Sequence, residues 1–92
     1  MVNDQDLELL REQLASIEHA RWSHWQNFMH GKCSVNLDGS LTIPKELVEK
    51  WEKQYKTKYS ELTDKEKESD REQVDKYLPL IKNFITLKLN EE

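Results

Sequence analysis

Apolar residues recur every three or four positions over the first thirty residues of the chain, which is the spacing of one face of a helix. The recurring residues are Leu7, Leu10, Leu14, Ile17, Trp25 and Phe28. Asp4 or Asp6 is suited to cap the start of this helix, and Gly31 is suited to end it. The pattern therefore predicts one long N-terminal helix.

The helical spacing breaks from residue 32 to residue 42. Asp38-Gly39 lies there between two short segments that contain apolar residues, an arrangement typical of a tight turn. Two interpretations remain open for this stretch. It is either a short β-hairpin over residues 33–43 or a mobile loop.

A second helix is predicted after Pro44, because proline suits the first turn of a helix. The predicted helix ends near Lys56. Its apolar face consists of Leu47, Val48, Trp51 and Tyr55.

Thr63 and Glu66 have the spacing of a capping box and predict the start of the last helix. Pro79 lacks a backbone N–H and crowds the carbonyl of Asp75, so this helix should kink there or restart with Pro79 in a new first turn. Its apolar stripe consists of Val74, Tyr77, Leu78, Ile81, Phe84 and Ile85. The expected fold is a single, mainly α domain over residues 1–92, with three to four helices.

Composition restricts the classes of function. The chain has 92 residues, of which 35% are charged, and its net charge is −4 without a concentrated basic patch. Nucleic-acid affinity depends largely on cationic contacts with phosphates, so direct nucleic-acid binding is not expected. The single cysteine excludes an internal disulfide, the acidic start lacks the pattern of a signal peptide, and no apolar run approaches membrane-helix length. We therefore expect a cytoplasmic protein.

Charged residues occupy positions at which helix periodicity predicts a core. Glu18 and Arg21 fall inside the apolar arc of the first helix, and Lys67 and Asp70 fall inside that of the last. Buried charges are costly unless they are paired. The coincidence indicates either a closed internal ion network or the floor of a polar pocket.

In the closed network, Arg21 and Asp70 form a charge-assisted pair across the helix packing, and Glu18 and Lys67 support it. The network would then only hold the helices in register. With a closed network, the chain would be a protein-interaction or structural accessory module.

In the open pocket, some of these charges bind a small polar or anionic ligand. Trp22 or Trp25 would supply a stacking face, and Arg71 would supply a cation. His19 and Trp22 lie at the edge of the apolar arc, three residues apart, where they could line a groove beside the core.

The chain shows no signature of catalysis or of a metal site. No nucleophile-base pair and no nucleotide-binding glycine loop is present in the sequence. His19, His24, His30 and Cys33 do not have a standard ligand spacing. We expect no enzyme activity, no metal and no cofactor.

Two segments carry a resemblance to a known family. His19-x-x-Trp22 lies on the first helix, and the run from Tyr59 to Arg71 reads Tyr-Ser-Glu-Leu-Thr-Asp-Lys-Glu-Lys-Glu-Ser-Asp-Arg. With these motifs the chain resembles the RyR domain, the repeat module named for ryanodine receptors and also found in bacterial and phage proteins. The resemblance covers about residues 15–80, and the layout is also similar to that of short phage and prophage proteins.

The resemblance implies a noncatalytic module that occurs as paired repeats in the receptors and is suggested to sense nucleotide-like ligands in prokaryotes. The positions of this chain that match the family's pattern are His19, Trp22, Lys67, Asp70 and Arg71. Together with Arg21, these residues are the candidate ligand site for a small nucleotide-like molecule.

A homodimer is a further expectation from the sequence. Apolar residues spread around much of the C-terminal helix end, where one partner face cannot cover them all, so a second chain could cover the surplus. The residues concerned are Phe84, Ile85, Leu87 and Leu89. The alternative is a frayed tail after Pro79.

Overall fold

The computed structural model describes residues 2–91 of the chain. Four α-helices and one two-stranded hairpin follow one another in this part. The elements are α1 (Asp4–Gly31), β1 (Ser34–Val35), β2 (Leu41–Thr42), α2 (Lys45–Lys56), the 3₁₀ turn η1 (Tyr59–Glu61), α3 (Asp64–Val74) and α4 (Leu78–Asn90). The predictions of a mainly α fold and a long first helix are confirmed, and of the two interpretations left open for residues 33–43 the structure shows the short hairpin.

The residue that caps α1 is Asn3, so the prediction of Asp4 or Asp6 as the cap is wrong. The Asn3 side chain accepts a hydrogen bond from the backbone N–H of Asp6 at 2.9 Å, and the Asp6 carboxylate accepts one from the backbone N–H of Asn3 at 3.1 Å. This reciprocal capping box satisfies two backbone donors at the helix start. Asp6 therefore takes part in the cap as its third helical residue.

The hairpin after α1 is an antiparallel pair in which Ser34 faces Thr42 and Val35 faces Leu41. Gly39 at its tip has a φ of 86°, a left-handed conformation that residues with a Cβ rarely adopt. The Asp38 carboxylate accepts a hydrogen bond from the Ser40 backbone N–H at 2.9 Å. The Asp38-Gly39 pair therefore makes the tight turn that its sequence indicates.

The ends of the remaining helices follow their local sequence. α2 ends at Lys56, as predicted, but begins at Lys45, so that Pro44 is its N-cap and not part of its first turn. Thr63 and Glu66 form the predicted capping box at the start of α3. The C-terminal helical segment is broken: α3 ends at Val74, and α4 restarts with Pro79 in its first turn.

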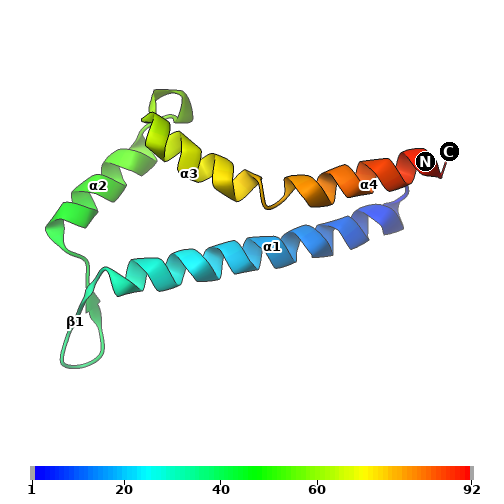
Figure 1. Ribbon diagram of the computed structural model, residues 1–92. Helices are drawn as coiled ribbons and strands as arrows, with labels where there is room; N and C mark the ends of the chain where they lie inside the picture. The colour runs from blue at the N-terminus through cyan, green and yellow to red at the C-terminus, as the bar shows by residue number, and fades with distance from the viewer. Residues whose placement is uncertain (1, 92) are drawn as a thin grey trace.

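The helices form an open, flat frame (Figure 1). α4 returns beside the N-terminal half of α1, so the two ends of the chain lie close together, while α2 and α3 leave the α1–α4 pair to form the other end of the frame. The Cα atoms extend over 59 × 35 × 17 Å. In Figure 1 no helix lies in front of another, so the frame is close to a single layer of helices.

The seam between α1 and α4 is the best covered part of this frame. Its half-buried apolar side chains are Leu10, Leu14 and Ile17 on α1 and Leu80 and Phe84 on α4. At its end, the Lys88 ammonium lies 2.9 Å from the Asp6 carboxylate, with side chains only 17% and 22% exposed. None of the described residues is fully buried. The frame therefore has a partly covered seam and no enclosed core.

Candidate functional site

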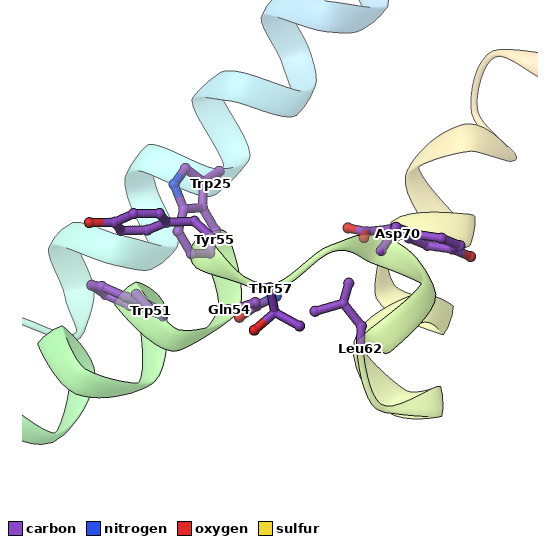
Figure 2. A pocket seen from close by; sticks show the side chains of 8 residues that line it. Trp25, Trp51, Gln54, Tyr55, Thr57, Leu62 and Asp70 are labelled. Atoms are coloured by element: carbon purple, nitrogen blue, oxygen red, sulfur yellow. The ribbon is translucent and has the colours of Figure 1, made fainter.

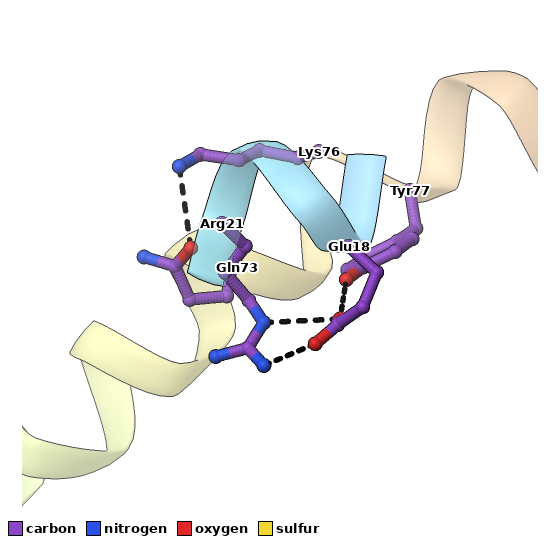
Figure 3. Close-up of polar contacts among 5 residues, drawn as sticks. All are labelled: Glu18, Arg21, Gln73, Lys76 and Tyr77. Atoms are coloured by element: carbon purple, nitrogen blue, oxygen red, sulfur yellow. Dashed lines mark hydrogen bonds and ion pairs between the residues drawn. The ribbon is translucent and has the colours of Figure 1, made fainter. Parts of the chain in front are cut away.

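Glu18, Arg21 and Tyr77 form a polar cluster where α1 passes the junction of α3 and α4 (Figure 3). The Arg21 guanidinium donates to the Glu18 carboxylate through Nε at 3.0 Å and also through a second nitrogen. The Tyr77 hydroxyl donates to the same carboxylate at 2.5 Å across 59 residues of sequence. This hydrogen bond joins the middle of α1 to the C-terminal half of the chain.

The cluster stabilises the charged form of Glu18. The hydrogen bonds from Arg21, and then the one from Tyr77, lower the pKa of Glu18 from about 4.5 to about 2. The same carboxylate raises the pKa of Arg21 and the pKa of Tyr77, since it favours the protonated form of each. All three groups are therefore held in fixed charge states at neutral pH.

The predicted pairing of Arg21 with Asp70 is not found among the described residues. Arg21 instead bonds to Glu18, one turn away on its own helix, because residues three apart on a helix are neighbours. The predicted burial is also wrong. The Arg21 side chain is 38% exposed and that of Glu18 is 51% exposed, and Asp70 lies on the surface.

Two predicted cations on α3 also contact their own segment. The Lys67 ammonium lies 5.8 Å from the centre of the Tyr59 ring, which is a cation–π distance. Arg71 pairs with Glu68 at 3.3 Å. Lys67 therefore does not join the ion cluster of α1, and Arg71 is already neutralised by a neighbour.

His19 and Trp22 lie one above the other on α1, with ring centres 6.2 Å apart and ring planes 22° apart. The His19 ring nitrogen is also 3.4 Å from the Ser23 hydroxyl. Trp22 is 53% exposed. Neither residue lines one of the hollows described below.

An aromatic hollow of about 410 Å³ opens where α1, α2 and the η1–α3 segment meet. Figure 2 shows Trp25, Trp51 and Tyr55 on one side of it, and Leu62 and Asp70 on the other. The Trp25 and Trp51 rings meet edge to face with centres 5.6 Å apart, which docks α2 onto α1. The full lining is Trp25, Trp51, Gln54, Tyr55, Thr57, Tyr59, Leu62 and Asp70.

A second hollow of about 420 Å³ adjoins the first and shares Trp25, Gln54 and Asp70 with it. Its lining is more polar and includes Arg21, which belongs to the ion cluster. The other residues lining it are His24, Phe28, Ser69, Glu72 and Gln73. The two hollows together form one groove, which we call the aromatic groove.

Asp70 lies where the two parts of the aromatic groove meet. Within residues 2–91 its carboxylate has no ion pair and no side-chain hydrogen bond. The Gln54 side chain, also shared by both parts, has no such bond with the described residues either. A carboxylate and an amide are therefore available to hydrogen-bond a molecule in the groove.

The structure brings together only part of the predicted site. Arg21 and Asp70 line the same half of the groove, whereas Lys67 and Arg71 line neither half. The sequence assigned Trp51 and Tyr55 to a core and did not identify Gln54. No sequence signal identifies these three as groove residues, because their role depends on how α2 docks against α1.

The described residues hold no group of three or more side chains suited to a metal ion. Cys33 is a free thiol 3.3 Å from the Met29 carbonyl oxygen. Within the same range, no helix has the length and apolar character needed to cross a membrane. Comparisons of the chain with models of protein families, with curated proteins and with solved structures found no match.

Proposed function

We propose that this chain is a noncatalytic binding module whose aromatic groove takes a small, flat ligand with N–H groups, of the nucleobase or nucleoside class. The observation that carries the proposal is the unpaired Asp70 carboxylate among aromatic side chains at the centre of the groove. The resemblance to the RyR domain supports the same general role.

The shape and lining of the groove favour a flat ligand. Each half has a volume of about 410–420 Å³, within the range of about 300–1,000 Å³ typical of small-molecule sites. Trp25, Trp51 and Tyr59 line the more aromatic of the two halves. Aromatic side chains stack on nucleobases, and each such contact contributes about 1–3 kcal/mol to binding.

The charges favour an N–H donor over a phosphate. Asp70 and Glu72 place two carboxylates along the groove, while the one arginine that lines it, Arg21, is held by Glu18. A carboxylate accepts hydrogen bonds from the amino and ring N–H groups of nucleobases, as it does in the recognition of cytosine. The groove therefore fits the base of a nucleotide-like ligand better than its phosphate. This restricts the polar or anionic ligand expected from the sequence to the nucleobase or nucleoside class.

The proposal is tested by titrating the full chain with guanosine, adenosine, cytidine and uridine, with calorimetry and tryptophan fluorescence as readouts. Binding of at least one nucleoside at millimolar concentration or below is expected. Asp70→Asn should weaken it about tenfold or more, since a charge-assisted hydrogen bond contributes about 1.5–3 kcal/mol.

Glu68→Gln is the matched control, because it removes one carboxylate from the same helix outside the groove. It should bind as the unmodified chain does, and circular dichroism should show both variants folded. Absence of binding for all four nucleosides would overturn the proposal, as would an unchanged affinity in folded Asp70→Asn. Tighter binding of tetramethylammonium than of any nucleoside would also overturn the proposal, because the aromatic rings would then bind an organic cation and not a nucleobase.

Protein association is the second candidate function, and the flat shape of the frame favours it. The Glu18, Arg21 and Tyr77 cluster is internally paired, as the closed-network alternative requires, although its members differ from those predicted. Apolar side chains remain exposed on α4 at the opposite end of the frame from the groove.

A further inference from the structure

α4 carries apolar side chains on two different sides. Leu80 and Phe84 face the seam with α1, where they line a hollow together with Asp6 and Leu9. Leu78, Pro79, Ile81 and Ile85 line a separate hollow of about 790 Å³, which is formed by residues of α4 and the turn before it. Leu78 and Ile85 are 50% and 52% exposed. We call this second side the outer face of α4.

The outer face belongs to a chain that is more extended than a compact domain, in which another element covers the apolar side of each helix. Its radius of gyration is 18.5 Å, compared with about 12 Å for a compact chain of this length. Only α4 and the turn before it line the hollow on the outer face, so a partner is needed to cover this face.

We propose that a second copy of this chain covers the outer face, in a two-fold dimer that packs outer face against outer face. The N-terminal half of α1 and α4 form an antiparallel pair of helices in each copy. The outer face is turned away from α1, so the two α4 helices lie side by side at the centre of the dimer and the two α1 helices lie outside them. The aromatic groove lies at the other end of the frame and stays open.

The chain exposes more surface than a compact monomer of the same mass. Its exposed surface is 7862 Å², whereas a compact monomer of 11.1 kDa exposes about 5,700 Å². The excess is spread over the whole frame, and the outer face of α4 contributes one apolar part of it.

Charges beside the outer face are complementary to those of a second copy. Asp75 and Lys82 line the same hollow seven residues apart, and neither has an ion pair with another described residue. A two-fold axis midway between them sets Asp75 of one copy opposite the partner's Lys82, and the reverse. Each dimer then gains two ion pairs at the rim of the apolar contact.

Sedimentation equilibrium and light scattering of the full chain test the dimer directly. A mass of twice 11.1 kDa is expected. Ile85→Asp should weaken dimerisation at least a hundredfold, because it places a charge inside the apolar contact. The control Asn90→Asp adds the same charge to α4 at an exposed residue that lines neither hollow, about 140° around the helix from Ile85, and should leave the mass unchanged.

Two further measurements decide the outcome if Ile85→Asp fails to fold. The melting temperature of the unmodified chain should rise with chain concentration, because mass action stabilises a dimer. Lys82→Asp should weaken association about tenfold, and adding Asp75→Lys to it should restore association, since the exchanged charges are complementary again.

A monomer mass together with a concentration-independent melting temperature would overturn the dimer. Failure of the charge exchange to restore association would overturn the antiparallel arrangement. Nucleoside binding is measured at the other end of the frame, so either proposal can fail without the other.

Discussion

Replacing Trp25 with alanine should destabilise the fold by about 2–3 kcal/mol, because this side chain docks α2 onto α1. Trp25 is 40% exposed, so about 60% of its surface is covered. A tryptophan presents about 250 Å², and the covered share of about 150 Å² corresponds to almost 4 kcal/mol at about 25 cal/mol per Å². A compact denatured state lowers this figure by about 10–40%.

Trp22→Ala is the matched control on the same helix. Trp22 is 53% exposed, and the aromatic partner it contacts is His19 on its own helix, whereas Trp25 stacks on Phe28 of its own helix and also meets Trp51 across the gap to α2. A contact within α1 also forms in any state that keeps the helix, so Trp22→Ala should cost less than about 1 kcal/mol.

The assay is urea unfolding followed by far-ultraviolet circular dichroism, with all variants at one chain concentration. The difference of about 2 kcal/mol between the two variants corresponds to about 10 °C in melting temperature for a domain of this size. If Trp25→Ala does not fold, Trp25→Phe should keep part of the contact and fall between the alanine variant and the parent. Equal losses for Trp25→Ala and Trp22→Ala would refute the docking of α2 against α1.

Two other predictions follow from local features of the fold. Because the pKa of Glu18 is lowered to about 2 in the folded state, the stability that its ionised form contributes is present above about pH 4.5 and lost as pH falls towards 2. The stability difference between the parent and Glu18→Gln should therefore shrink over that interval in urea melts, and a constant difference would contradict the role of the cluster. Gly39→Ala should destabilise the hairpin by about 1–2 kcal/mol, because the Cβ of alanine makes a backbone φ of 86° unfavourable. Loss of the Ser34–Thr42 cross-strand contacts in nuclear magnetic resonance spectra, with the helical signal kept, is the expected result, and unchanged contacts would refute the strain.

Local chemistry explains why the sequence predicts most of the elements. Thr63 with Glu66, Asp38 with Gly39, and Pro79 act through backbone groups within a few residues of themselves. Their effects therefore do not depend on the rest of the fold. The wrong prediction of Asp4 or Asp6 as the cap of α1 is also a local matter, since Asn3 is the cap and Asp6 completes its capping box.

The candidate site is harder to predict than the helices. The spacing of residues identifies which of them share a helix face, but not which other element packs against that face. Periodicity assigns both Arg21 and Asp70 to buried helix faces and so predicts a pair between them. Arg21 has a carboxylate one turn away in Glu18, which it reaches without any tertiary contact, so Asp70 is left unpaired in the groove. A neighbouring residue on the same helix competed with the distant one.

The sequence by itself determined where the helices begin, end and break, because caps, turns and proline act locally. The tertiary structure decided which residues share a space: Trp25 with Trp51, Glu18 with Tyr77, and Asp6 with Lys88. It also decided that the frame stays one layer thick, so that the expected buried charges lie at the surface. The physical reason is that helix faces are fixed by spacing along the chain, whereas their partners depend on the direction the chain takes at each turn.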